Sequence, residues 1–158
     1  KQVATVVGDD GNTSPSEYRT SEIAWIDDNP QTQWIYEKIA GYAKTANREM
    51  WNFDIWGFHD SLQYTTYFGD GGHYDWHADL GPSISNRKLS VVLQLSDPSE
   101  YEGGDFEFFN LVNFPDKEII RKQGTILFFP SFLEHQATPV TKGKRHSLAA
   151  WFEGPKWR

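Results

Sequence analysis

The sequence predicts a mainly β protein, either a barrel or a jelly roll of about eight short strands, with an N-terminal helix packed against it. Two observations favour this class. One helical segment occurs early in the chain, and after about residue 52 short apolar segments alternate with turns. The 158 residues have the length of about one domain, and no repeat or linker divides them. We therefore expect a single domain over residues 1–158.

The first elements are a short strand and a helix. Residues 1–17 are expected to form a loose N-terminal arm, because the stretch "VGDDGNTSPSE" after the short strand "VATVV" is polar and contains Gly and Pro. A helix is predicted from Asn29–Pro30 to about Asn47, since Asn29 can cap it and Pro30 suits its first turn. The expected apolar face of this helix consists of Trp34, Ile35, Ile39, Tyr42, Ala43 and Ala46.

The rest of the chain is predicted to form strands separated by turns. The expected strands lie near residues 61–68, 73–79, 88–96, 104–109, 117–121, 125–129, 133–139 and 145–152. Between them lie "GDGG", "GPSISN", "DPSEYEGG", "NFPD", "KQG" and "TKGK", which all carry turn-forming residues. A helix followed by about eight such strands is typical of a helix-buttressed barrel or jelly roll.

The composition excludes several classes of protein. The 15 basic and 22 acidic residues give a net charge of -7, which disfavours a general nucleic-acid binder. The chain has no cysteine, so disulfides, thiolate metal sites and cysteine nucleophiles are excluded. No apolar run approaches a membrane span and no signal peptide is visible, so we expect a cytoplasmic protein without membrane contact. The sequence carries no signal for an oligomeric state.

The stretch "GGHYDWHADLG" contains the first candidate site. Its glycines, including Gly71 and Gly81, disfavour a helix, so the helical spacing of His73 and His77 is interpreted as an accident. In an extended segment residues two apart share a face, so His77 and Asp79 are expected to project together. One imidazole and one carboxylate are two of the three ligands in a metal site of two histidines and one carboxylate.

The remaining candidates lie about sixty residues downstream. His135, in "FLEHQATPV", is the best second histidine, on a predicted strand. In "KRHSLAAWF", Arg145 and Ser147 share one face of a strand, and an arginine with a hydroxyl neighbour suits a carboxylate. The other histidines, His59, His73 and His146, are interpreted as structural or solvent-facing.

At these residues the sequence resembles the Fe(II)- and 2-oxoglutarate-dependent oxygenases, specifically the prolyl 4-hydroxylase-like and PKHD-type hydroxylases. The matching segments are "YRTSEIAWI", "GGHYDWHAD", "RKLSVVLQLSD", "YEGGDFEFF" and "GTILFFPSFLEHQATPVTKGKRHSLAAWF". Together they run over most of the chain. The resemblance implies a double-stranded β-helix, which is a jelly roll, with N-terminal helical support.

The resemblance also assigns residues. It implies that His77, Asp79 and His135 ligate Fe(II), and that Arg145 binds the distal carboxylate of 2-oxoglutarate with help from Ser147. Members of the family usually place a tyrosine nine residues before the first ligand, and here Phe68 occupies that position. Either a one-residue bulge brings the adjacent Tyr67 into contact with 2-oxoglutarate, or the contact is lost. Tyr64, on the same strand, is a further candidate for this contact.

The function implied by the resemblance is hydroxylation of an unactivated C–H bond, most simply of a prolyl or other residue in a peptide or protein. The co-substrates would be 2-oxoglutarate and O2, with release of succinate and CO2 and with ascorbate as reductant. Trp76 and Trp151 are candidate substrate contacts, although such residues often belong to a core.

Three alternatives stay open. The same chemistry could act on a free amino acid or other small molecule, or on nucleic acid. Enzymes of the nucleic-acid class carry a second arginine six residues after the first, and here Trp151 stands at that position, which disfavours this reading. A non-catalytic jelly-roll metal-binding module, or a zinc site with the same ligands, is the third alternative.

Overall fold

The computed structural model describes residues 1–7, 13–14 and 17–157. Its strands are β1 (Gln2–Val3), β2 (Val6–Val7), β3 (Thr13–Ser14), β4 (Arg19–Thr20), β5 (Glu22–Ile26), β6 (Gly57–Phe58), β7 (Leu62–Phe68), β8 (His73–His77), β9 (Arg87–Gln94), β10 (Tyr101–Gly103), β11 (Phe106–Phe108), β12 (Ile126–Pro130), β13 (His135–Ala137) and β14 (Val140–Glu153). Its helices are α1 (Gln33–Met50), the 3-10 helix η1 (Pro98–Glu100) and α2 (Lys117–Arg121).

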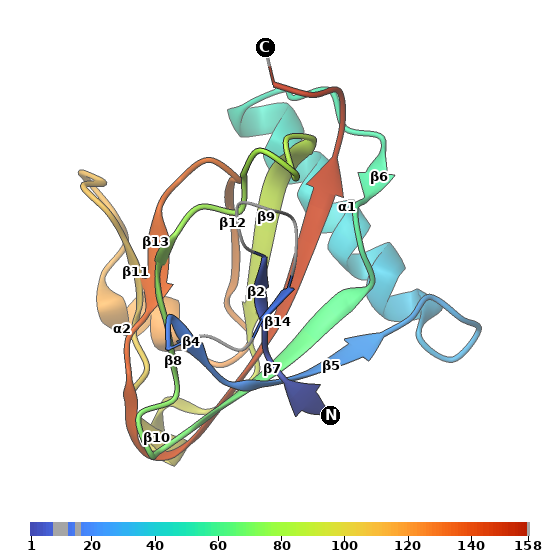
Figure 1. Cartoon of the computed structure of the whole chain (residues 1–158). Coiled ribbons are helices and arrows are strands. Elements are labelled where there is room, and N and C mark those ends of the chain that lie inside the picture. The colour runs from blue at the N-terminus through green and yellow to red at the C-terminus, as the bar shows by residue number, and fades with distance from the viewer. Residues whose placement is uncertain (8–12, 15–16, 158) are drawn as a thin grey trace.

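The strands form two larger antiparallel sheets, which confirms the predicted jelly roll. The major sheet has the order β1-β5-β7-β14-β9-β12, with β10 and β6 also paired to β14. The minor sheet has the order β11-β13-β8-β4. Figure 1 shows the minor sheet on one side of β7, β9 and β14, and α1 on the other side. The short pair β2 and β3 stands apart from both sheets.

The main hydrophobic core lies between α1 and the major sheet. Tyr36, Ile39 and Ala43, spaced by three and four residues along α1, are buried against Leu62, Leu89, Val91, Leu148, Ala150 and Phe152. The Tyr36 hydroxyl donates to the Ile26 carbonyl at 2.6 Å and accepts from the Leu62 N–H at 3.1 Å. These two bonds satisfy the only polar atom of a buried ring and tie the helix to the sheet.

The predicted helix exists, but its ends and part of its buried face differ from the prediction. Helix α1 begins at Gln33, and the turn before it uses Asn29, whose side chain accepts from the Gln31 N–H at 2.9 Å. Trp34 and Tyr42, both expected on the apolar face, are more than half exposed. Because both residues are apolar, the prediction placed them on the buried face. The sheet instead contacts the face of α1 centred on Ile39.

The prediction of a strand at residues 117–121 is wrong, because this segment is helix α2. The adjacent Ile119 and Ile120 suggested a strand, yet only Ile120 is buried and Ile119 is exposed. Glu118 in the first turn and Arg121 in the last turn match the helix dipole, which favours the helix. The stretch "YEG" at residues 101–103, expected as a turn, forms β10 and pairs with β14.

The N-terminal arm is only partly described. Strand β1 pairs with β5, and Ala4 beyond it is fully buried. Residues 8–12 and 15–16 lie outside the described part of the chain, so the loose arm stays a prediction. Within residues 1–7, 13–14 and 17–157, no helix combines the length and apolar character needed to cross a bilayer.

Strand β14 positions much of the site because it pairs with β7 on one side and with β9 on the other. Its side chains alternate between the two faces of the sheet. Leu148, Ala150 and Phe152 belong to the core beneath α1. Arg145, Ser147, Ala149 and Trp151 instead line a cavity of about 660 Å³ that faces the minor sheet.

Candidate active site

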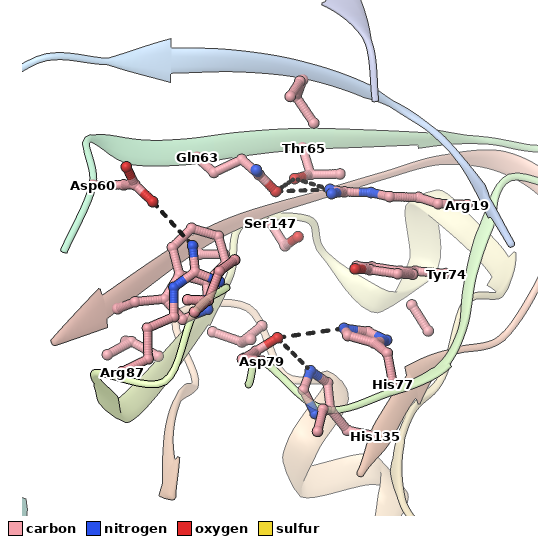
Figure 2. Close-up of a pocket in the computed structure, with 18 of the residues that line it drawn as sticks. Arg19, Asp60, Gln63, Thr65, Tyr74, His77, Asp79, Arg87, His135 and Ser147 are labelled. Carbon is pink, nitrogen blue, oxygen red and sulfur yellow. Dashed lines mark hydrogen bonds and ion pairs between the residues drawn. The ribbon is translucent and has the colours of Figure 1, made fainter. Parts of the chain in front are cut away.

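Three predicted ligands meet at one end of this cavity. His77 ends β8, Asp79 follows two residues later, and His135 begins β13 directly opposite His77 in the strand register. The Oδ1 atom of Asp79 lies 3.5 Å from Nε2 of His77 and 3.6 Å from Nε2 of His135. One candidate ligand atom from each of the three residues lies within 4.8 Å of the other two. Figure 2 shows the three side chains converging.

Both imidazoles are oriented by the same local bond. Nδ1 of His77 lies 2.7 Å from the carbonyl of Asp75, and Nδ1 of His135 lies 2.8 Å from the carbonyl of Leu133. Because a carbonyl only accepts, each Nδ1 carries the proton and donates it. Each Nε2 is then left with a lone pair directed to the shared centre, as metal-binding histidines require.

The carboxylate of Asp79 is held in a similar way. Its Oδ2 atom accepts from the Ser90 hydroxyl at 2.6 Å, and the Ser90 oxygen in turn accepts from the Ser131 hydroxyl at 2.9 Å. Ser90 and Ser131 are fully buried, so this support is rigid. Oδ1 is the oxygen that faces the two imidazoles, which favours binding of an ion through one oxygen.

Burial and charge set the protonation of these groups. Burial, reinforced by the neighbouring His135, lowers the pKa of His77 to about 4. Burial alone would raise the pKa of Asp79, but the nearby His135 and His77 and the Ser90 hydroxyl together lower it. At neutral pH His77 is therefore uncharged and Asp79 is ionised. A divalent metal ion needs both of these forms.

Arg145, on the β14 wall of the same cavity, is 1% exposed. Its NH2 group donates to Oε1 of Gln94 at 2.9 Å, while its buried Nε has no hydrogen-bond partner among the described residues. No ion pair involves Arg145 within the described part of the chain. Ser147, two residues further on, is also buried and lines the cavity. A buried guanidinium without a carboxylate fits an anionic ligand.

Gly104 makes room for this guanidinium. Its φ of 63° lies in the left-handed region, which favours glycine. A Cβ atom at this position would lie 2.8 Å from Cγ2 of Val140 and 3.1 Å from Cδ of Arg145. The turn predicted at Gly103–Gly104 therefore also shapes the arginine pocket.

The structure separates the two candidate tyrosines. Tyr67 is buried, lines the cavity and pairs across the strands with Arg145, whose guanidinium lies 5.2 Å from its ring. No bulge brings it there, because Tyr67 lies opposite Arg145 in a regular register. Tyr64 is a correction: it faces the other side of β7, and its hydroxyl lies 2.8 Å from Nδ1 of His146. Tyr64 and Tyr67 are three positions apart on a regular strand, so their side chains face opposite sides of the sheet.

The two candidate tryptophans also differ. Trp151 is buried, lines the cavity and stacks under the Arg87 guanidinium, 4.1 Å from its ring. Trp76 is a correction, because it does not line this cavity. It lines a separate, smaller pocket and packs edge-on against Phe109 at 5.6 Å.

The remaining histidines have local partners away from the three ligands, although His59 lines the same cavity. Nδ1 of His59 lies 2.9 Å from Glu153, and His73 contacts the carbonyls of Gly71 and Glu17. The strand predicted at residues 73–79 is confirmed as β8, so His73 and His77 are not neighbours on a helix.

Two arginines in the cavity were not predicted from the residue pattern. Arg19 is buried, with its NH2 group 2.7 Å from Oε1 of Gln63 and its Nε 3.0 Å from the Ser21 hydroxyl. Arg87 donates to Asp60 at 2.9 Å, and its buried Nε has no partner among the described residues. The signal for Arg19 was available in "YRTSEIAWI", where an arginine begins a short β segment.

The fold and site define a jelly-roll protein with a centre of two histidines and one carboxylate, and with a separate buried cation for an anionic ligand. The family model described as 2OG-Fe(II) oxygenase superfamily matches residues 62–153. The chain belongs to this superfamily. The donor set is the one that suits non-haem Fe(II), and Arg145 with its unpartnered Nε fits a carboxylate of 2-oxoglutarate.

The relatives that match this chain in sequence include several PKHD-type hydroxylases. A PKHD-type hydroxylase of Synechococcus sp. (strain CC9902) is 38% identical over 96 residues, covering 60% of this chain and 41% of the relative. A PKHD-type hydroxylase of Nitrosomonas europaea is 33% identical over 89 residues, covering 52% of this chain and 38% of the relative. The matched segments thus span about two-fifths of these relatives.

Solved structures share the fold. A Pseudomonas putida prolyl-4-hydroxylase has a TM-score of 0.68 and 20% identity, covering 90% of this chain and 77% of that one. A prolyl hydroxylase from Trichoplax adhaerens, solved with a peptide fragment of hypoxia inducible factor, has a TM-score of 0.71 and 21% identity. The match covers 90% of this chain and 66% of the Trichoplax chain. At this identity the likeness establishes the jelly roll alone.

Proposed function

We propose that this chain is the catalytic region of an Fe(II)- and 2-oxoglutarate-dependent dioxygenase that hydroxylates an unactivated C–H bond. One observation carries the proposal. A complete metal-ligand set and a buried guanidinium without a carboxylate partner face the same cavity. A metal-binding module without catalysis would have no use for the second feature.

In this proposal His77, Asp79 and His135 hold Fe(II). When bound, the iron with 2-oxoglutarate and O2 supplies the oxidation of the C–H bond, and 2-oxoglutarate leaves as succinate and CO2. The residues contribute fixed geometry. The bonds from each Nδ1 to a carbonyl and from Ser90 to Asp79 hold the three ligand atoms at one centre, so the ligands need little rearrangement to bind the ion.

Arg145 is proposed to bind the distal carboxylate of 2-oxoglutarate. Gln94 orients the planar guanidinium by accepting a hydrogen bond from its NH2 group. The buried Nε–H is left available to donate to a ligand. Ser147 and Tyr67 flank the guanidinium and can donate their hydroxyl protons to the same carboxylate. Burial of this end excludes water, which strengthens the charge-assisted bonds.

The proposed substrate is a peptide or protein, oxidised at a prolyl or other residue. Three wall features support a peptide: the flat indole of Trp151, the guanidinium of Arg87 with its unpartnered Nε, and the guanidinium of Arg19. Cationic donors of this kind can bind backbone carbonyls. The shared fold with the prolyl-4-hydroxylase of Pseudomonas putida supports the prolyl preference.

Succinate release tests the proposal. The purified chain, loaded with Fe(II) and supplied with 2-oxoglutarate, O2 and ascorbate as reductant, is expected to release succinate above the level of a metal-free control. Proline-containing peptides are then screened by mass spectrometry for the gain of one oxygen. Peptides with alanine in place of proline serve as matched controls and should stay unmodified.

The outcomes separate the alternatives. Succinate release together with oxidation of a free amino acid, and of no peptide, would replace the peptide substrate by a small molecule. Oxidation of an alkylated oligonucleotide would favour the nucleic-acid reading, which the net charge of -7 disfavours. Metal binding with neither binding nor consumption of 2-oxoglutarate would reduce the protein to a metal-binding module.

A further inference from the structure

The two histidines of the metal-ligand set are supported by different surroundings. His135 is 4% exposed and packs among the rings of Phe106, Phe108 and Phe129, at centroid distances of 5.4, 6.1 and 4.8 Å. This aromatic wall fixes the plane of the His135 ring from several directions. His77 has no such wall. Apart from His135, the ring contact recorded for it within the described residues is with Tyr74.

The contact between Tyr74 and His77 is a close parallel stack. The ring centroids are 3.5 Å apart and the planes differ by 11°. The guanidinium of Arg19 lies 4.5 Å from the centroid of the Tyr74 ring. Figure 2 shows Tyr74 between Arg19 and His77, so a guanidinium, a phenol and an imidazole form one column on the wall of the cavity.

A β-bulge makes this stack possible. Residues three apart on a regular strand face opposite sides of the sheet. Between His135 and Ala137 the strand β13 advances by two residues, while the paired residues of β8, His77 and Tyr74, are three apart. The extra residue in β8 turns Tyr74 and His77 to the same side. The irregularity therefore has a consequence for the site.

We propose that Tyr74 is a positioning residue that sets the plane of the His77 imidazole, with Arg19 holding the tyrosine ring from the other side. This proposal rests on the metal site of the proposed function. The bond from Nδ1 to the Asp75 carbonyl fixes one direction of the ring but leaves rotation about that bond. The stack removes this rotation, so Nε2 stays aligned with the lone-pair direction that a bound ion needs.

Arg19 is held rigidly enough to support the Tyr74 ring. Its guanidinium is anchored by Ser21 and Gln63 and has a longer contact of 3.4 Å to the Thr65 hydroxyl. No carboxylate forms an ion pair with it among the described residues, so the face of the cation is free to stack on an aromatic ring. Two polar anchors on β7 and one in the residue before β5 thus support the metal site through Arg19 and Tyr74.

Metal affinity in the absence of 2-oxoglutarate and peptide tests the proposal, because substrate contacts then contribute nothing. Co(II) binding to the whole chain is followed by calorimetry and by the visible absorption of the bound ion. Tyr74→Leu removes the stack and is expected to weaken Co(II) binding about 10- to 100-fold and to change the shape of the visible bands. Tyr74→Phe keeps the stack and is expected to retain the affinity and the spectrum.

The matched variants separate the possible explanations. Equal affinities for Tyr74→Leu and the wild type would overturn the positioning role, and so would an equal loss in Tyr74→Phe, because the hydroxyl rather than the stack would then matter. Arg19→Gln provides a second test if Tyr74→Leu does not fold, as judged by circular dichroism. It is expected to broaden or shift the Co(II) bands, and an unchanged spectrum and affinity would overturn the column. If the wild type does not bind Co(II) or Fe(II), the proposed function fails and this inference with it.

Discussion

The two groups of site residues that line the cavity, called here its arginine end and its metal-ligand end, are built in opposite ways. The arginine end stands on β14, a strand of fourteen residues that runs in regular register with β7 from Lys144 to Ala149. The metal-ligand end stands on β8 and β13, which have five and three residues and are paired with a bulge. One end is positioned by a long regular ladder, and the other by short strand ends with local bonds.

This difference explains how each end keeps its geometry. On β14 the alternation of the strand places Arg145 and Ser147 on the cavity face without further help. At the other end each histidine is fixed by a bond to the carbonyl two residues before it, Asp75 for His77 and Leu133 for His135. Short irregular strands supply ligands from several directions, which a flat regular sheet cannot do.

The largest expected effect comes from removing a ligand at the irregular end. His135→Ala deletes one of three ligand atoms, and we expect loss of detectable turnover and a strong loss of Fe(II) or Co(II) affinity. The fold should remain, because β13 is short and the main core lies on the other side of the major sheet. Succinate release, metal titration and circular dichroism measure these three properties.

His73→Ala is the matched control, since His73 lies on β8, the strand that pairs with β13, and its ring nitrogens contact backbone carbonyls rather than the ligand centre. It should leave turnover and metal affinity unchanged. Full activity of the His135→Ala variant would remove this residue from the ligand set.

The metal-free protein is expected to lose stability in acid because of His77. Burial lowers the pKa of this group from 6.5 to about 4, so the unfolded chain binds a proton that the folded chain does not accept between these values. The free energy of unfolding should therefore fall as the pH drops from 6.5 toward 4, by roughly 3 kcal/mol from this group. Urea unfolding of the wild type and of His77→Gln across this range measures the difference.

Because other groups titrate in the same range, the comparison between the two proteins is the informative quantity. His77→Gln should lose less stability than the wild type over this window. Parallel curves for the two proteins would show that the imidazole is protonated as easily in the folded state as in the unfolded one.

At the regular end, Arg145→Ala is expected to raise the 2-oxoglutarate concentration needed for half-maximal succinate release. Charge-assisted hydrogen bonds in a buried site contribute about 2–3 kcal/mol, which corresponds to roughly 30- to 150-fold. Metal affinity without 2-oxoglutarate should change little, because the guanidinium is not part of the ligand set.

Lys144→Ala is the matched control, because Lys144 is adjacent in β14 but exposed. It should leave the 2-oxoglutarate requirement unchanged. An equal change in both variants would assign the effect to the charge of the strand rather than to the buried fork.

The contrast between the regular strand β14 and the irregular pair β8 and β13 also explains which parts of the site could be predicted from the sequence. Arg145, Ser147 and Trp151 follow from alternation along one strand, and the structure places all three on the cavity wall. The extended conformation of "HYDWHAD" was predictable from its glycines, and with it the shared direction of His77 and Asp79. These inferences needed only local regularity.

The parts that could not be predicted depend on irregularity or on contacts between sheets. Tyr74 reaches the site through a bulge that leaves no mark in the residue pattern. Arg19 and Arg87 enter the cavity because β4 and the start of β9 are packed around it. Trp76 was misplaced for a different reason: it directly precedes His77 on β8, so alternation along the strand directs it away from the cavity and toward the other pocket.

The smallest expected effect separates Tyr67 from Tyr64. Tyr67→Phe removes a hydroxyl at the arginine end, and a neutral hydrogen bond contributes about 0.5–1.5 kcal/mol, so the 2-oxoglutarate requirement should rise roughly 2- to 12-fold. Tyr64→Phe should leave this requirement unchanged, because its hydroxyl contacts His146 on the other face of the sheet. Titrating 2-oxoglutarate against succinate release in both variants measures the difference. A rise in Tyr64→Phe alone would mean that the register of β7 against β14 places the wrong tyrosine beside Arg145.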